Sequence, residues 1–370
     1  MKAKVARIVV KVGSSTLTDA SGRIDKSAIA GLSEQLARQF RSGTQVVLVT
    51  SGAIRAGMER LDMKMRPRSM PEQQAAAAVG QGLLMGAYTQ AFSTSGIAVA
   101  QALLTRDDFS DRKRYLNARN TLNTLLALGA IPIVNENDTV ANEEIKFGEN
   151  DTLAALVAAA LGADLLILLS DVEGLYDTRS NAPAKGQLVR EVRRIGRDIL
   201  AMAGGTEGPA GSGGMKTKID AARITMRSGV TMVIADGRRP NVVADVAAGK
   251  TIGTKFVADE RTLNSRKRWI AFGAAVRGTI VVNEGAARML VEEGTSLLAA
   301  GITDLSGNFK AGDLVVIVDE ANTHVGRGFV NYAASELRLI RGKRSSEIES
   351  VLGYKYFDEV IHRDNMALGV

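Results

Sequence analysis

The 370-residue sequence contains no cysteine and only two histidines, His324 and His362. Without cysteine, the chain can form no disulfide, thiolate nucleophile or zinc–thiolate site. Because both histidines lie late in the chain, histidine acid–base chemistry and multi-histidine metal centres are excluded from the first three hundred residues. Any chemistry in that part has to use lysine, carboxylate, amide or backbone groups.

The sequence also lacks an apolar run of about 18 residues, the length that a membrane-spanning helix needs. Hydrophobic residues still make up 45% of the sequence, enough to form a large core. A chain of 370 residues is longer than the chain that folds around a single hydrophobic core in most proteins. Residues 1–12 lead directly into a strand pattern rather than a signal peptide. We therefore expect a cytoplasmic protein of about two domains with no membrane partner.

The net charge of +7 is unevenly distributed along the chain. Residues 1–277 carry a formal charge of +11, whereas residues 278–370 carry −4. The basic part could attract a polyanionic small molecule such as a nucleotide as readily as a nucleic acid. Because RNA binding usually calls for a basic surface, the acidic C-terminal part argues against a nucleic-acid partner.

Short β-branched runs alternate with longer helical patterns over the first 240 residues. Strands are expected at 6–12, 45–50, 97–104, 131–135, 164–169 and 230–235, and helices at 26–41, 71–92, 112–128, 151–161 and 215–227. Strands that are apolar on both faces and separated by helices predict an α/β fold, a mostly parallel sheet sandwiched by helices. In such folds, ligands bind beyond the carboxyl ends of the strands.

The pattern changes after this α/β domain, which is expected to span residues 1–262. Residues 263–277 are expected to be a linker, residues 278–353 a small β-rich barrel domain, and residues 354–370 a charged tail. Within the second domain, strands are expected at 279–283, 296–303, 312–319, 326–332 and 337–342, with one helix at 286–293.

Two polar segments directly follow the first two predicted strands. Lys11 ends the first strand and precedes Gly13 and Ser14, so an ammonium and free backbone N–H groups are presented together, which suits a phosphate. Ser51 and Gly52 follow the second strand, where small residues let a substrate approach the backbone. Taken alone, an ordinary turn explains the first segment better and the second equally well.

Polar side chains also follow the fourth predicted strand. Residues 135–138 are Asn, Glu, Asn and Asp, and Asn150 with Asp151 opens the next helix. Such groups can hold an amine and orient other ions. Considered by itself, Asp151 is better explained as an N-cap, because Asp directly before an apolar helix is typical of that position.

Two later segments suit a nucleotide. Ser170 and Asp171 end a very apolar strand, where they could hold a ribose or a base, or form an ordinary Asx turn. Residues 211–218 form a glycine-rich run that enters a helix, so N–H groups and the helix dipole favour bound phosphate. Lys218, in the first turn, can reach a transferring phosphoryl group. A flexible linker is the alternative for this run.

Together, the ordered motifs KVGSS, TSGAI, NENDTV, FGENDTLAA, LLSDVEGLY and GSGGMKTK resemble the amino acid kinase family over about residues 1–260. The module from Gly278 to about Gly353 looks like a PUA domain. The combination is similar to family members that phosphorylate the γ-carboxylate of L-glutamate with ATP, the first step toward proline. The alternatives are an N-acetylglutamate kinase of the same fold and an RNA-binding regulatory protein with an inactive kinase fold.

The resemblance implies a role for each motif residue. Lys11 and Lys218 would be catalytic and stabilise the transferring phosphoryl group, and Asp151 would orient both lysines. The substrate positions would be Ser51, Gly52, Asp138 and Asn150, with Asp138 suited to the α-amino group. The nucleotide positions would be Lys11, Gly13, Ser14, Ser170, Asp171, Ser212, Gly213, Gly214, Met215, Lys216, Thr217 and Lys218.

The implied chemistry is compatible with the scarcity of histidine. A glutamate side chain has a pKa of about 4.3, so near neutral pH it is already an ionised nucleophile and needs no general base. The resemblance also implies Mg²⁺ held through the ATP phosphates, with no metal site on the protein itself. It further implies inhibition by proline, assembly into a homo-oligomer (dimer or tetramer), and a glutamyl phosphate reductase as partner.

Overall fold

The computed structural model of the chain describes residues 5–19, 23–140, 149–177, 186–203, 214–259, 270 and 275–369. The chain divides into two compact units. Unit 1 comprises Met1–Asp108 and Leu116–Thr262, and unit 2 comprises Phe109–Tyr115 and Leu263–Val370. Each unit has a hydrophobic core of its own.

Unit 1 is built on an eight-stranded sheet with the order β3-β4-β2-β1-β5-β9-β10-β8. Its strands are β1 (Arg7–Val12), β2 (Gln45–Val49), β3 (Val99–Leu104), β4 (Ile131–Glu136), β5 (Leu165–Ser170), β8 (Glu191–Val192), β9 (Thr231–Asp236) and β10 (Thr254–Phe256). All neighbouring pairs are parallel except β9 with β10. A two-stranded sheet, β6 (Tyr176–Asp177) with β7 (Gln187–Leu188), stands apart from it. The predicted mostly parallel sheet is confirmed.

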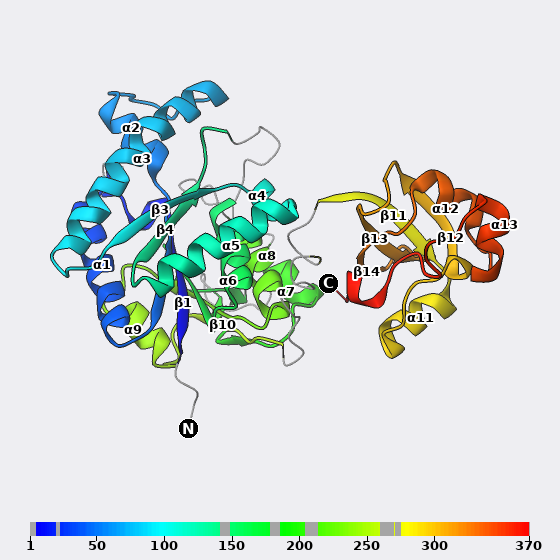
Figure 1. The fold of residues 1–370 in the computed structure, drawn as a ribbon. Coiled ribbons are helices and arrows are strands. Elements are labelled where there is room, and N and C mark those ends of the chain that lie inside the picture. Colours follow the sequence, from blue (N-terminus) through cyan, green and yellow to red (C-terminus); the bar gives the residue numbers. More distant parts are fainter. Residues whose placement is uncertain are drawn as a thin grey trace. The chain divides into compact units, whose positions relative to one another are not determined.

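Helices cover both faces of this sheet (Figure 1). They are α1 (Lys26–Arg41), α2 (Ala53–Arg60), α3 (Met70–Ser93), α4 (Arg106–Ser110), α5 (Arg112–Ala127), α6 (Glu149–Leu161), α7 (Arg197–Ala203), α8 (Met215–Arg227) and α9 (Val242–Ala247). Ile8 and Val10 of β1 share a core cluster with apolar residues of α1, α3 and α9. Because side chains alternate along a strand, Val9 and Lys11 face the opposite side, where α6 packs against β1 and α8.

Helices α2 and α3 cross at direct backbone contact. A Cβ atom added at Gly57 of α2 would overlap the carbonyl group of Ala76, and one added at Gly80 of α3 would overlap the carbonyl group of Ala53. Glycine is therefore required at both crossing positions. Since α2 begins two residues after Ser51, this crossing fixes the chain that follows β2.

Unit 2 contains a five-stranded sheet with the order β12-β11-β13-β14-β15. Its strands are β11 (Val276–Val282), β12 (Ile302–Gly307), β13 (Leu314–Asp319), β14 (His324–Phe329) and β15 (Met366–Leu368). Its helices are α11 (Glu284–Glu293), α12 (Ala334–Ile340) and α13 (Ile348–Leu352). The predicted small β-rich module is confirmed, and β15 comes from residues expected to form a tail.

Two of the strands predicted in unit 2 are wrong in whole or in part. The segment 337–342 lies mostly in helix α12, because Glu336 Oε2 accepts a hydrogen bond from Ala333 N at the helix start and Leu337 and Ile340 are buried at helical spacing. Of the segment 296–303, only the last two residues belong to β12. The buried Leu297 instead forms an isolated bridge, and a short 3-10 turn follows it.

None of the described helices is both long and apolar enough to cross a membrane.

Candidate active site

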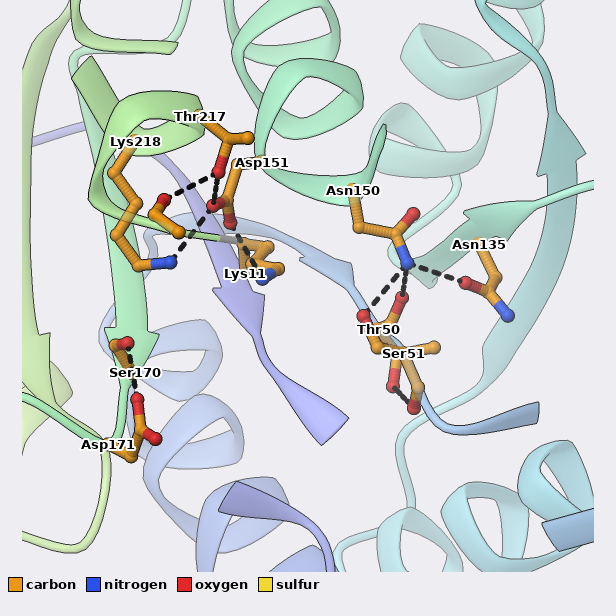
Figure 2. Close-up of polar contacts among 11 residues, drawn as sticks. Lys11, Thr50, Ser51, Asn135, Asn150, Asp151, Ser170, Asp171, Thr217 and Lys218 are labelled. Atoms are coloured by element: carbon orange, nitrogen blue, oxygen red, sulfur yellow. Dashed lines mark hydrogen bonds and ion pairs between the residues drawn. The ribbon is translucent and has the colours of Figure 1, made fainter. Parts of the chain in front are cut away.

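The polar segments predicted from the sequence gather at one edge of the unit 1 sheet. Strands β4, β2, β1 and β5 are parallel neighbours, so their carboxyl ends meet at the same edge. Lys11, Thr50, Asn135 and Ser170 lie at these four ends. Helices α6 and α8 begin at the same edge, so their first turns face the strand ends (Figure 2).

A buried carboxylate joins two lysines from different elements at this edge. Asp151 Oδ1, in the first turn of α6, lies 2.6 Å from Lys11 Nζ of β1, and Asp151 Oδ2 lies 3.0 Å from Lys218 Nζ of α8. Thr217 Oγ1 donates to the same Oδ2 atom at 3.0 Å. The Asp151 side chain is 1% exposed, and the lysine side chains are 11% and 7% exposed. One carboxylate therefore fixes both ammonium groups.

The charges of this cluster do not cancel. Burial disfavours the charged form of Asp151, but the positive charges of Lys11 and Lys218 and the hydrogen bonds that they donate outweigh it and lower its pKa to about 2. The two lysines and the one carboxylate carry a net formal charge of +1 in a largely buried site. Such a charge attracts an anion, and a phosphoryl group fits this requirement.

The N-cap interpretation, which the sequence favoured for Asp151 only when that residue was considered by itself, is wrong. Helix α6 begins at Glu149, so Asp151 is the third residue of the helix. Its carboxylate instead contacts two lysines and a threonine hydroxyl, which come from other elements.

Asn150 gathers the ends of β2 and β4 into a second cluster. Its Nδ2 atom lies 3.1 Å from Thr50 O, 2.8 Å from Ser51 Oγ and 3.2 Å from Asn135 Oδ1 (Figure 2). The next residue after Ser51 is Gly52, which has a φ of 106° and precedes the first turn of α2. Gly52 provides no side-chain cap, so N–H groups of that turn stay available to a carboxylate.

Asp138 follows β4 and differs in electrostatics from Asp151. Burial alone raises its pKa to about 6, and its carboxylate forms no ion pair or hydrogen bond with the described residues. A desolvated carboxylate without a partner is favourable for an ammonium ligand, whose charge would restore the ionised form.

The predicted nucleotide positions lie at the ends of β1 and β5 and at the start of α8. Gly13 N donates to Leu169 O at 3.2 Å, which ties the two strand ends together, and Ser14 follows in a 3-10 turn (Ser14–Thr16). Ser170 Oγ donates to Asp171 Oδ1 at 3.1 Å (Figure 2).

At the start of α8, Gly214 is the N-cap and provides no side-chain acceptor, so N–H groups of the first turn can bind phosphate. Met215 is half-buried, whereas Lys216 is exposed. Thr217 Oγ1 also contacts Gly214 O at 2.9 Å. Ser212 and Gly213 lie outside the described residues.

Two polar residues that support the site, Gln81 and Tyr88, were not singled out from the sequence. Asn135 Nδ2 donates to Gln81 Oε1 at 2.8 Å, and Thr50 Oγ1 lies 2.8 Å from the buried Tyr88 hydroxyl. Asn135 belongs to the polar run 135–138 that was singled out from the sequence. Gln81 and Tyr88 lie within the long helix α3, whose alanine-rich sequence gave no signal of a polar contact.

Comparison with known proteins agrees with this geometry. The model of the amino acid kinase family matches residues 6–236, and the PUA domain model matches residues 278–352. The chain therefore belongs to the amino acid kinase family, and the resemblance inferred from the ordered motifs is confirmed.

Relatives that match nearly the whole chain narrow the comparison from the family to one kind of enzyme. The chain is 50% identical to a glutamate 5-kinase of Caldanaerobacter subterraneus subsp. tengcongensis, covering 98% of this chain and 97% of that protein. It is 49% identical to a glutamate 5-kinase of Moorella thermoacetica, covering 97% and 95%. Among solved structures, carbamate kinase from Giardia lamblia bound to AMP-PNP has a TM-score of 0.50 at 20% identity and covers 70% of this chain and all of that one, which supports the fold.

Proposed function

We propose that this protein transfers the γ-phosphoryl group of ATP to the γ-carboxylate of L-glutamate, giving L-glutamyl 5-phosphate. The observation that carries the proposal is the Asp151 carboxylate with its two lysines, one from β1 and one from α8. This cluster occupies the same sheet edge as Ser51, Asn150 and Asp138. Relatives about 50% identical over nearly the whole chain are named glutamate 5-kinases.

The reaction needs no proton transfer. A carboxylate oxygen of glutamate attacks the γ-phosphorus of ATP, the bond from that phosphorus to the bridging oxygen breaks, and ADP leaves with the bonding electrons. Lys11 and Lys218 would offset negative charge on the oxygens of the phosphoryl group in the transition state. Asp151 would hold the two ammonium groups in place, so that they need no reorganisation during the reaction.

The residues of the site fit a metal ion that arrives with the nucleotide. Among the described residues, no group of three or more His, Cys, Asp or Glu side chains could hold a metal ion. Both oxygens of Asp151 already face lysines. We therefore propose that Mg²⁺ is bound through the ATP phosphates, where it would neutralise part of their charge.

Asp138 supports glutamate over N-acetylglutamate as the acceptor. Burial raises the pKa of its carboxyl group to about 6, and no ion pair joins that carboxylate to a lysine or arginine of the described residues. A free α-amino group would supply the missing positive charge, whereas an acetylated one would not. An RNA-binding protein with an inactive kinase fold is less compatible, because Lys11, Asp151 and Lys218 are all present and residues 278–370 carry a charge of −4.

The family resemblance supports four further proposals. We propose that proline inhibits the enzyme at or overlapping the glutamate site, and that the chain assembles into a dimer or tetramer through its kinase domain. A glutamyl phosphate reductase would receive the unstable product. The cytoplasm is the proposed location, and the absence of cysteine from the sequence is compatible with it.

A hydroxylamine-trapping assay tests the proposed function. The protein would be incubated with ATP, Mg²⁺ and one acceptor: L-glutamate, N-acetyl-L-glutamate or L-aspartate. We expect hydroxamate from L-glutamate alone and its suppression by proline. Hydroxamate from another acceptor would mean that Asp138 does not select the α-amino group of L-glutamate. A complete lack of hydroxamate with every acceptor would contradict the proposed activity.

A further inference from the structure

Three side-chain amides from three different elements form a chain of hydrogen bonds that ends at the predicted glutamate site. Asn150 Nδ2 of α6 donates to Asn135 Oδ1 of β4 at 3.2 Å. Asn135 Nδ2 in turn donates to Gln81 Oε1 of α3 at 2.8 Å. We call Asn150, Asn135 and Gln81 the amide relay. Only Asn150 was expected from the sequence to contact substrate.

The direction of the relay is set by a backbone carbonyl. Thr50 O can only accept a hydrogen bond, so the amide of Asn150 must present its NH₂ group on that side, 3.1 Å away. The same NH₂ group lies 2.8 Å from Ser51 Oγ and 3.2 Å from Asn135 Oδ1. With Oδ1 on that side, the Nδ2 atom of Asn135 is turned toward α3. Gln81 Oε1 is the acceptor that completes this order.

The orientation leaves one atom of Asn150 unused. Its Oδ1 atom is buried and has no hydrogen-bond partner among the described residues. Figure 2 shows the dashed lines converging on the nitrogen of Asn150, with the oxygen on the other side of the amide. A buried hydrogen-bond acceptor without a partner costs folding free energy, so we infer that a bound ligand donates a hydrogen bond to this Oδ1 atom. The α-ammonium group of glutamate is such a donor.

Helix α3 gives the relay a rigid end. Gly80, directly before Gln81, packs against the backbone of α2, so the helix cannot shift there without a clash. Two turns further along α3, the fully buried Tyr88 hydroxyl lies 2.8 Å from Thr50 Oγ1. The helix therefore contacts both Asn135 and Thr50, two of the three residues that accept hydrogen bonds from Asn150.

We propose that Gln81 is a positioning residue for the acceptor: through Asn135 it holds the Asn150 amide in the orientation that accepts a hydrogen bond from the α-ammonium group of glutamate. This inference rests on the proposed function. Gln81 acts through Asn135 and Asn150, without touching the reacting atoms. Its removal lets the Asn135 amide rotate, which costs affinity for the acceptor and leaves the Lys11–Asp151–Lys218 cluster in place.

The test compares Gln81→Met with two other variants in steady-state assays that vary glutamate and ATP separately. Gln81→Met keeps the side-chain length and removes the accepting oxygen. We expect its KM for L-glutamate to rise about tenfold, as for loss of one buried hydrogen bond, with kcat and the KM for ATP within about twofold of wild type. Gln81→Glu keeps an oxygen that accepts from Asn135 Nδ2, and we expect its KM within about threefold of wild type.

Gln90→Met is the matched control, because Gln90 is exposed on the same helix and the substitution changes helix propensity equally. Its kcat and its KM values for L-glutamate and ATP should equal those of the wild type. The proposal is overturned if Gln81→Met leaves the KM for glutamate unchanged, if it lowers kcat and raises the KM for ATP to the same degree, or if Gln81→Glu is equally impaired. A wild-type enzyme without glutamate-dependent turnover would instead refute the proposed function, and the inference with it.

Discussion

At the scale of the residue, the same type of side chain is placed in two opposite electrostatic states. Burial alone would raise the pKa of Asp151, but Lys11 and Lys218 outweigh burial and lower this pKa to about 2, so Asp151 stays ionised. Asp138 is buried with no ion pair to the described residues, and burial raises its pKa to about 6. In the proposed function, the first carboxylate would hold a fixed positive charge for phosphate, and the second would pair with the positive charge of the acceptor.

Lys218→Ala tests the first of these roles. The substitution removes one of the two lysine side chains at the proposed phosphoryl position and leaves Asp151 with Lys11 and Thr217. We expect kcat to fall about 10²- to 10³-fold with unchanged circular dichroism, because the lost interaction stabilises charge in the transition state. Unchanged turnover in a folded variant would remove Lys218 from the mechanism.

The pH dependence tests Asp138. Below its raised pKa, the free enzyme carries a neutral Asp138 that cannot pair with an ammonium group. We therefore expect kcat/KM for L-glutamate to fall as the pH drops through about 6. A bound ammonium favours the ionised form, so the corresponding limb in kcat should lie at lower pH.

Asp138→Asn is the control for that profile, because it is nearly isosteric and cannot titrate. It should raise the KM for glutamate and abolish the acidic limb near pH 6. An acidic limb that persists unchanged in the variant would assign the titration to another group.

At the scale of the element, the sequence predicted most of the sheet but only part of the site. Helices α1 and α8 begin and end at the predicted residues, because apolar spacing marks them clearly and Asp25 caps α1. Site residues that directly follow apolar strands were predictable for the same reason, since parallel strand ends share one edge.

Contacts between distant elements were not predictable in this way. Asp151 resembled a local cap because its two lysines come from β1 and α8, far away in the sequence. Gln81 gave no signal, since its partner Asn135 lies 54 residues later. Helix α12 was taken for a strand, because a seven-residue amphipathic segment fits either period.

The α2–α3 crossing gives a prediction at this scale. Gly80→Ala places a methyl group against the backbone of Ala53 and Gly57, and we expect it to lower the free energy of unfolding by about 1–3 kcal/mol. Gly82→Ala on the exposed side of the same helix meets no atom and should raise it by about 0.5–1 kcal/mol. Urea denaturation measures both. Equal stability of the two variants would contradict the close crossing.

At the scale of the whole molecule, two units with separate cores predict two unfolding transitions. Mg²⁺ with a non-hydrolysable ATP analogue should raise the midpoint temperature of one transition and leave the other unchanged, because a ligand stabilises only the unit that binds it. Scanning calorimetry measures both midpoints. At about 100 times the dissociation constant, the stabilisation is about 2.7 kcal/mol. One transition that shifts as a whole would show that the units unfold together.

The central claim is that a carboxylate oxygen of glutamate attacks the γ-phosphorus of ATP, and isotope transfer tests it most directly. Glutamate labelled with ¹⁸O in its γ-carboxylate would react with ATP in the presence of hydroxylamine. Hydroxylamine attacks the acyl carbon, so the released phosphate keeps the oxygen that joined carbon to phosphorus. We predict inorganic phosphate that carries one ¹⁸O atom. Phosphate without the label would contradict the account, because it would mean that another oxygen received the phosphoryl group.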